Sequence, residues 1–275
     1  MAAHTLVGYI LAVGLDGAQR GERLGPALLG IGLWVVCLNG GTLALNSAYD
    51  RDEGDIAYLR RPPPPPTHLA TFGFCLMTLG LLGALFLPVG YQAAYALCLG
   101  LSVLYSVPPL RLKAVPGVDW VINMWGFGTL TPYAGWAATG VPVDLTHGLV
   151  LLAFCPLFAA LYPLTQIYQV EEDSRRGDRT LALVLGTRRS LLVSLGAAGA
   201  AFALLALAGI RAGWGTQDAW RWLALALCSV TWGVILGFWL LRQGGMSPRE
   251  HQRGMYQALG AWALTDLAVV LAWGT

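Results

Sequence analysis

Long apolar runs separated by short polar loops constrain the fold of this chain more than any other feature of its sequence. Eight runs of about 18 or more residues carry almost no charge, and a shorter run opens the chain. Runs of this length and hydropathy are typical of membrane-spanning helices. The runs lie at about 3–15, 25–49, 67–87, 90–107, 118–139, 148–169, 190–210, 219–241 and 255–273. The sequence therefore predicts an all-α, polytopic membrane protein with about nine transmembrane helices.

Composition agrees with this prediction. Of the 275 residues, 56% are hydrophobic and only 12% are charged, whereas a soluble domain carries about 25% charged residues. The opening run, 3–15, is too short to span alone, and a cleaved signal peptide is the alternative. No basic segment precedes this run and no small-residue cleavage site follows it, so we interpret it as a first helix.

The basic residues are distributed unevenly between the two sides of the predicted bundle. With nine helices, the segments 50–66, 108–117, 170–189 and 242–254 fall on one side, and they contain 13 of the 17 basic residues. Cytoplasmic loops carry the excess of Lys and Arg in membrane proteins. We therefore expect these four segments to lie in the cytoplasm.

Two clusters of acidic residues directly follow apolar runs on that same side. Four acids lie within 50–55 and four more within 171–178. An amide precedes an aspartate by four residues in each cluster, Asn46 before Asp50 and Gln169 before Asp173. Residues at i and i+4 share one helix face, so each span is predicted to end with an amide and a carboxylate stacked together. The repetition suggests halves at about 1–115 and 116–275.

A magnesium diphosphate site would explain why acids, amides and arginines gather here. Mg²⁺ binds through one or two carboxylates and substrate phosphates, and nearby Arg and Lys bind the remaining phosphate oxygens. Solvation of ordinary loop charges is the alternative, but it does not explain amides such as Asn46 and Gln166 at the helix ends. Neither a P-loop motif nor a CxxC pair occurs in the chain.

Four stretches of the chain resemble one family. NSAYD (46–50) is similar to the first NxxxD motif of the UbiA superfamily of intramembrane prenyltransferases. YSVPPLRLKAVPGVDWVIN (105–123) resembles the stretch that joins its fourth and fifth helices, and QVEEDSRRGDRTLALVLG (169–186) resembles its second motif, DxxxDxxxGxxTLAVxLG. HTLVGY (4–9) resembles the opening of its first helix. Each motif alone is weak, but the set in this order is specific.

The resemblance implies a single transmembrane domain over 1–275, with helices around a central cavity that opens to lipid. It implies Mg²⁺ as cofactor and an isoprenoid diphosphate as substrate. Diphosphate is lost, and a lipophilic or aromatic acceptor then attacks the prenyl group. Membrane lipid is the expected surrounding partner, and no nucleic acid is expected. An intramembrane terpene cyclase is the alternative within the superfamily, and a cation transporter is a reading from a different class.

Carried over position by position, the resemblance implies a set of site residues. The expected catalytic residues are Asp50, Asp173, Arg111 and Lys113. The expected metal ligands are Asn46, Asp50, Asp55, Gln169, Glu172 and Asp173. The expected substrate-binding residues are Asn46, Arg111, Lys113, Asp119, Asn123, Gln166, Gln169, Arg179, Tyr49 and Tyr168. Ordinary packing is the alternative for the two tyrosines.

Two departures from the family pattern affect the expected metal ligands. Gln169 stands where the second motif usually has its first aspartate, so Glu172 is expected to supply the missing charge. In the first motif the commonest position for the next acid is Gly54; Asp55 is the preferred replacement and Asp52 the alternative.

Two further acids have two readings each. Asp119, with Asn123 four residues on, either binds diphosphate or orients Arg111 and Lys113, or it simply opens a helix, where an acid suits the dipole. Asp266 lies within the last apolar run and is either a buried, hydrogen-bonded acid or a cavity acid.

Overall fold

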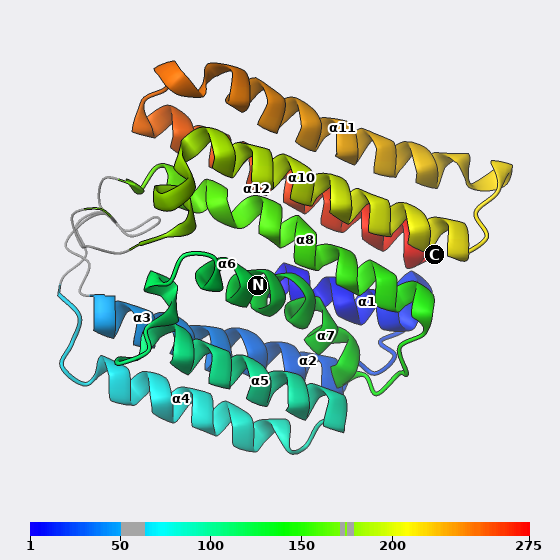
Figure 1. Ribbon diagram of the computed structural model, residues 1–275. Coiled ribbons are helices and arrows are strands. Elements are labelled where there is room, and N and C mark those ends of the chain that lie inside the picture. Colours follow the sequence, from blue (N-terminus) through cyan, green and yellow to red (C-terminus); the bar gives the residue numbers. More distant parts are fainter. Residues whose placement is uncertain (51–63, 171–173, 175–178) are drawn as a thin grey trace.

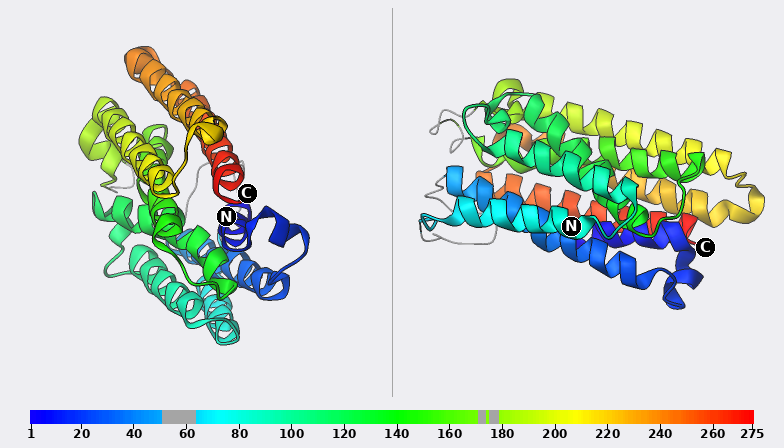
Figure 2. Two further views of the ribbon diagram at one scale, coloured as in Figure 1. Left: turned by 90° about the vertical axis from the view of Figure 1, so that its right-hand side faces the viewer. Right: turned by 90° about the horizontal axis from the view of Figure 1, so that it is seen from below.

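The computed structural model shows a bundle of roughly parallel helices (Figure 1). The structure describes residues 1–50, 64–170, 174 and 179–275, and no strand occurs in that part of the chain. Nine helical rods are formed by these described residues, which confirms the predicted all-α fold and helix count. Both views of Figure 2 show that the rods keep a common direction along their length.

The rods follow the predicted apolar runs closely. They are α1 (Ala2–Gln19); α2 (Leu24–Gly32), η1 (Leu33–Asn39) and α3 (Gly40–Asp50); α4 (Leu69–Ala84); α5 (Val89–Ser106); α6 (Val118–Asn123), η3 (Met124–Leu130) and α7 (Thr131–Ala138); α8 (Leu145–Ile167); α10 (Leu181–Arg211); α11 (Ala219–Arg242); and α12 (Pro248–Trp273). Short 3₁₀ turns, η2 (Leu112–Ala114), η4 (Thr216–Asp218) and η5 (Gln243–Gly245), lie between rods. η1 and η3 are π-helical segments within continuous rods.

Six helices in the described residues are long and apolar enough to cross a membrane by themselves. α4, with 16 residues, is a shorter apolar helix. α10 begins at Leu181 rather than at the predicted 190, and it is interrupted at Gly186, whose φ of 74° and ψ of 162° are not helical. The part after this break already includes Arg188 and Arg189, which are exposed. These spans make the chain an integral, multi-pass membrane protein.

Local sequence signals define the helix starts. Asp144 caps α8, where its carboxylate accepts hydrogen bonds from the backbone N–H groups of Thr146 and His147 at 2.8 and 3.0 Å. Ser247 and Glu250 form a capping box at the start of α12, and Pro248 occupies the first helical position. Such caps satisfy the backbone donors that a helix start leaves unpaired.

Small residues allow the rods to approach closely. α1 crosses α7 where a Cβ on Gly8 would overlap the carbonyl oxygen of Pro132, and a Cβ on Gly135 would overlap that of Thr5. Helices in membranes associate through such small-residue contacts because lipid supplies no hydrophobic drive between them. The crossing ties α1 to the rod that contains η3.

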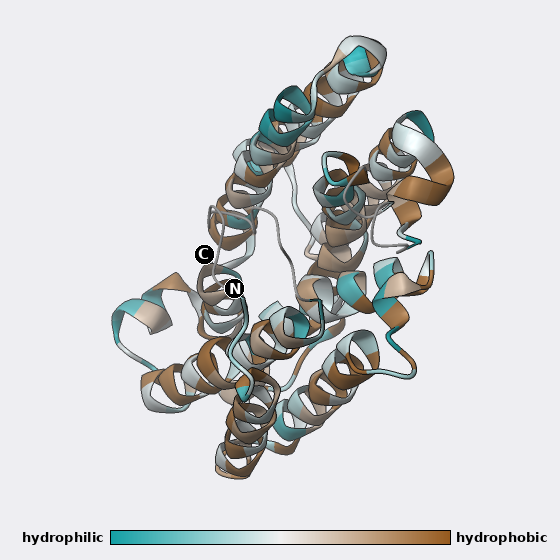
Figure 3. Ribbon diagram, turned by 90° about the vertical axis from the view of Figure 1, so that its left-hand side faces the viewer, coloured by the Kyte–Doolittle hydropathy of each residue, from teal (hydrophilic) through white to brown (hydrophobic). Residues whose placement is uncertain are grey.

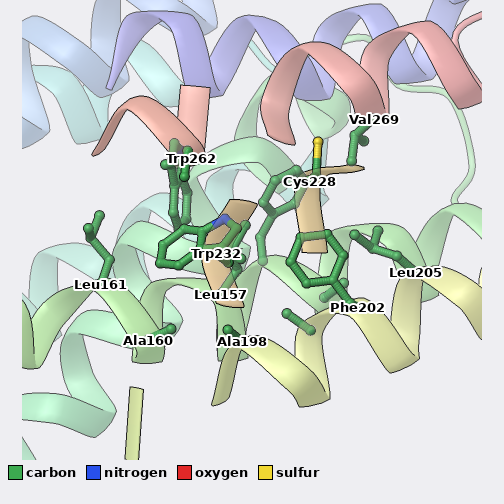
Figure 4. Packing of buried hydrophobic residues seen from close by; sticks show 14 of the residues in the cluster. Leu157, Ala160, Leu161, Ala198, Phe202, Leu205, Cys228, Trp232, Trp262 and Val269 are labelled. Atoms are coloured by element: carbon green, nitrogen blue, oxygen red, sulfur yellow. The ribbon is translucent and has the colours of Figure 1, made fainter. Parts of the chain in front are cut away.

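Buried apolar residues form two clusters. The larger cluster joins α1, α8, α10, α11 and α12, and Figure 4 shows Trp232 and Trp262 packed against Leu157 and Phe202 within it. The smaller cluster surrounds Trp34, Tyr91 and Tyr95 and joins η1, α4, α5 and α7. The candidate site lies beside this smaller cluster.

The described ends of all four basic segments lie at one end of the bundle. Figure 1 shows the end of α3, the start of α4, the loop before α6, the start of α10 and the α11–α12 connection at its left side. Figure 3 looks onto this end, where hydrophilic residues gather at helix termini while the rods are mostly hydrophobic. The predicted clustering of these segments on one side is confirmed.

Candidate active site

The first acidic motif ends α3 as predicted. Asn46 and Asp50 lie one helical turn apart, and the Asp50 side chain is only 6% exposed. The ammonium group of Lys113 contacts the Asp50 carboxylate directly and lies 3.5 Å from Oδ1 of Asn46. Nη2 of Arg111 lies 3.4 Å from Oδ1 of Asp50. The structure therefore brings together four of the residues that sequence analysis selected.

The loop between α5 and α6 presents the two cationic side chains to α3. Arg111 has a φ of +38°, in the left-handed region, and its backbone N–H donates to the carbonyl of Val107 at 3.1 Å. The 3₁₀ turn Leu112–Ala114 follows immediately and carries Lys113. These two tight turns reverse the chain, so that Arg111 and Lys113 both point back towards the end of α3.

The arrangement around Asp50 fits a cation held by oxygen atoms. Oxygens of Asn46 and Asp50 converge on the single Lys113 nitrogen, which marks a position where a cation is favoured. Oxygen donors are also the ligands that Mg²⁺ prefers. No group of three or more His, Cys, Asp or Glu side chains surrounds this position among the described residues. The expected ligands Asp55, Glu172 and Asp173, and the alternative Asp52, lie outside the described residues.

The second motif departs from its predicted geometry. α8 ends at Ile167, and Gln169 lies in the turn that follows. The backbone N–H of Gln169 donates to the carbonyl of Gln166 at 3.0 Å. Gln169 therefore lies beyond the end of α8 rather than within it, and its predicted partner Asp173 lies outside the described residues. The tight turn explains the difference, because its bond reaches back only three residues and does not continue the α-helical ladder.

Asp119 and Gln166 form a buried junction instead of facing open space. Oδ1 of Asp119 accepts from the backbone N–H of Gly117 at 2.8 Å, and Oδ2 accepts from Nε2 of Gln166 at 2.7 Å. Oε1 of Gln166 in turn accepts from the backbone N–H of Ala182 at 3.1 Å. These bonds support the helix-opening reading of Asp119. They also tie the ends of α6, α8 and α10 together beside the second motif.

The other expected substrate-binding residues have different surroundings. Asn123 donates to the backbone carbonyl of Asp119 at 2.8 Å and lines a cavity. Tyr49 packs against the smaller apolar cluster, and Tyr168 caps the end of α8. Arg179 is exposed just before α10. Packing thus accounts for Tyr49, as the alternative reading allowed.

An apolar cavity of about 160 Å³ adjoins the cluster around Asp50 at Asn46, which is the member of the cluster that lines it. Asn46 and Tyr105 lie at its polar end, and Trp34, Leu38 and Phe127 line its interior. Its walls come from α2–η1–α3, α5 and α6–η3, together with Met1 at the start of α1. The combination places a charged, oxygen-rich group beside a space suited to a hydrocarbon chain.

Two long-range contacts were not predicted. The hydroxyls of Tyr105 and Tyr162 lie 3.0 Å apart, between α5 and α8. His4 on α1 contacts Asp266 on α12 at 3.2 Å, and its other ring nitrogen lies 3.2 Å from the carbonyl oxygen of Gly128. Asp266 is therefore the buried, hydrogen-bonded acid of the first reading. No spacing in the sequence signals these pairs, because their members are far apart along the chain.

Part of the chain is similar in sequence to curated proteins. The chain is 30% identical over 174 residues to chlorophyll synthase of Arabidopsis thaliana, a match that covers 58% of this chain and 44% of that protein. It is 29% identical to digeranylgeranylglyceryl phosphate synthase of Natronomonas pharaonis, over 70% of this chain and 66% of that one. The chain thus spans between about half and two thirds of the length of these curated relatives.

Solved structures share the fold. A UbiA homologue from Archaeoglobus fulgidus, bound to DMAPP and Mg²⁺, superimposes with a TM-score of 0.69 at 19% identity, over 98% of this chain and 94% of that one. A digeranylgeranylglyceryl phosphate synthase gives a TM-score of 0.71 at 16% identity, over 99% and 92% of the two chains.

The family assignment rests on a match over nearly the whole sequence. Residues 2–257 match the model of the UbiA prenyltransferase family. This match confirms the resemblance seen in the four motif stretches. The chain belongs to the UbiA prenyltransferase family.

Proposed function

We propose that the protein is a Mg²⁺-dependent intramembrane prenyltransferase, which ionises an isoprenoid diphosphate and transfers its prenyl group to a lipophilic or aromatic acceptor. One observation carries the proposal: the Asn46–Asp50–Lys113–Arg111 cluster lies at the polar end of an apolar cavity. The cluster suits a diphosphate with its metal, and the cavity suits a prenyl chain. Membership of the UbiA prenyltransferase family supports the same reaction class.

The cluster contains the groups that diphosphate departure requires. Negative charge grows on the diphosphate as the allylic carbon–oxygen bond breaks, and fixed cations at that position lower the barrier. Arg111 and Lys113 would bind the diphosphate oxygens, while Asn46 and Asp50 would hold Mg²⁺. When bound, Mg²⁺ supplies Lewis-acid stabilisation of the leaving group. Asp173, Asp55 and Glu172 are the proposed remaining ligands.

The cavity supplies the second requirement, which is protection of the prenyl group. An allylic cation reacts with water, so a dry site favours its capture by the acceptor. Aromatic faces of Phe127 and Tyr105 line the cavity and can stabilise positive charge near them. Asp119 and Gln166 act as positioning residues, because they connect the start of α6, which follows the loop of Arg111 and Lys113, to the end of α8 and the start of α10, which flank the second motif.

The proposed orientation places the site at the cytoplasmic face. The four basic segments contain 13 of the 17 basic residues of the chain, and their described ends lie together at one end of the bundle. An excess of Lys and Arg marks cytoplasmic loops. Cysteine substitutions at Arg179 and at Arg211, which lie at opposite ends of the bundle, test this placement: only the former should be protected from an impermeant thiol reagent in intact cells.

The deciding experiment incubates purified protein with Mg²⁺ and C10, C15 or C20 isoprenoid diphosphates, with and without a panel of phenolic and lipid-alcohol acceptors. We expect diphosphate release that depends on an acceptor, together with a prenylated product in the organic extract. Release without any acceptor would instead identify a terpene cyclase. Absence of release under every condition would refute both reactions and favour transport.

A matched pair of variants connects the reaction to the site. Asp50→Asn should abolish release, because it removes a carboxylate that contacts both cationic side chains. Asp144→Asn changes an aspartate at the opposite end of the bundle and should retain activity, because Asn also caps helices well. Equal losses in both variants would disconnect the activity from the proposed site.

A further inference from the structure

The cavity has a polar mouth and an aromatic floor. Four lining residues of the α2–η1–α3 rod, Asn46, Thr42, Leu38 and Trp34, recur every four residues and so form one stripe down its wall. Twelve residues separate Asn46 from Trp34, which corresponds to about 18 Å at the rise of an α-helix and to somewhat less here, because Trp34 and Leu38 lie in the π-helical segment η1. Trp34 is the deepest lining residue of this rod and is 1% exposed.

Hydrogen bonds and aromatic contacts fix the Trp34 ring in place. Its indole N–H donates to Oγ1 of Thr131 at 3.3 Å, and that hydroxyl donates to the carbonyl of Gly126 at 2.8 Å. The rings of Tyr91 and Tyr95 pack edge-on against it, with centroids 6.0 and 6.1 Å away. Both tyrosines are fully buried, so they leave the indole no room to move aside.

We propose that Trp34 is a specificity-determining residue that limits the length of the isoprenoid accepted by the cavity. The inference rests on the proposed function. An extended isoprene unit advances by about 5 Å, from four carbon–carbon bonds of ordinary length. The stripe from Asn46 to Trp34 therefore accommodates about three units. A fourth unit meets a ring that cannot rotate away.

The cavity offers one other route for a longer chain. Leu43 lines the cavity and is 56% exposed, so it lies where the wall meets the lipid-facing surface. A chain that turned outward past Leu43 would escape the limit set by Trp34. A smaller residue in place of Trp34 should change the preferred chain length only if the prenyl chain runs towards Trp34. A chain that leaves past Leu43 does not depend on the size of the residue at position 34.

Two matched tryptophan variants distinguish an effect of the residue at the end of the cavity from an effect of loosened packing elsewhere in the protein. Trp34→Leu keeps an apolar residue but opens space at the deep end. Trp232 resembles Trp34 closely: it is 1% exposed, and its indole N–H donates to Oγ1 of Thr265 at 3.2 Å, whose hydroxyl donates to the carbonyl of Ala261 at 2.8 Å. It lies in the larger apolar cluster (Figure 4) and does not line the cavity. Trp232→Leu is therefore the control.

The experiment measures binding of unreactive C10, C15, C20 and C25 thiodiphosphate analogues, with Mg²⁺, to the purified proteins. For the wild type we expect the tightest binding at C15. Trp34→Leu should raise the affinity for C20 relative to C15 by at least tenfold, which is about 1.4 kcal/mol. Trp232→Leu should leave this ratio within twofold of wild type. Trp34→Phe, a milder change that retains a ring, should shift the ratio about threefold in the same direction.

The outcomes distinguish this inference from the function on which it rests. If the wild type binds no analogue, the proposed function fails, and the limit fails with it. If the wild type binds the analogues but neither Trp34 variant changes the ratio of the C20 to the C15 affinity, only the role of Trp34 as the end of the cavity is refuted. The prenyl chain then leaves the cavity past Leu43. If Trp232→Leu shifts the ratio as much as Trp34→Leu, the effect comes from loosened packing and the assignment of Trp34 is wrong.

Discussion

Replacement of Lys113 by Met tests whether its ammonium group occupies the position of the metal. That group contacts Asp50 and lies 3.5 Å from Oδ1 of Asn46, so a metal bound by both oxygens must displace it. Hydrogen bonds to charged groups contribute about 1.5–3 kcal/mol. The Lys113 side chain is only 10% exposed, so solvent weakens this interaction little. Lys113→Met should therefore tighten metal binding by about 10- to 150-fold in the absence of diphosphate.

The same substitution should weaken the binding of diphosphate, because it removes one of two cations at the site. Asp50 keeps Arg111 at 3.4 Å, so its carboxylate does not become a buried unpaired charge and the protein should remain folded. Binding of Mn²⁺, used in place of Mg²⁺, is measured by electron paramagnetic resonance, and binding of inorganic diphosphate by calorimetry. Arg211→Met, at an exposed position at the opposite end of the bundle, is the control. Unchanged or weaker Mn²⁺ binding in Lys113→Met would refute the overlap of the two cation positions.

Three further predictions concern the same end of the bundle. Asp50→Asn should lower kcat at least 100-fold and weaken Mn²⁺ binding, and intact Mn²⁺ binding would remove Asp50 from the ligand set. Gln166→Leu should lower the free energy of unfolding by about 2–5 kcal/mol, because Oδ2 of Asp119 loses a hydrogen-bond donor and the buried N–H of Ala182 loses its acceptor. Gln257→Leu, on the exposed surface, is the control and should not lower it. Glu172→Gln should raise the Mg²⁺ concentration needed for half-maximal rate, and a larger shift in Glu171→Gln would contradict the assignment of Glu172.

Features that depend on neighbouring residues were predictable from the sequence. The rods follow the apolar runs because a backbone in lipid must satisfy its own hydrogen bonds, which leaves helices as the solution for runs of this length. Asn46 and Asp50 share a face because both lie within one helix, where the i, i+4 relation holds. The end of α8 was not predictable in this way: the helix ends two residues before Gln169, and no proline or glycine marks that end.

Features that depend on distant partners were not predictable in the same way. Gln166 was expected to bind substrate because a polar residue near the end of an apolar run suggests function. Its two partners, Asp119 and the backbone of Ala182, belong to other rods, and no local pattern identifies them. The polarity of the residue was therefore informative, whereas its role was decided by the packing of α6, α8 and α10.

The His4–Asp266 pair shows why a charged residue persists inside the last span. The carbonyl of Gly128 can only accept, so Nε2 of His4 carries a proton. Asp266 accepts a hydrogen bond from the indole of Trp262 at 3.1 Å. Its carboxyl group also lies 3.2 Å from Nδ1 of His4, which is 262 residues away in the chain. A lone carboxylate would be costly at this depth, whereas this one is fully partnered. Because Gly128 belongs to η3, whose residues Gly126 and Phe127 line the cavity, the same pair joins α1 and α12 to the cavity wall.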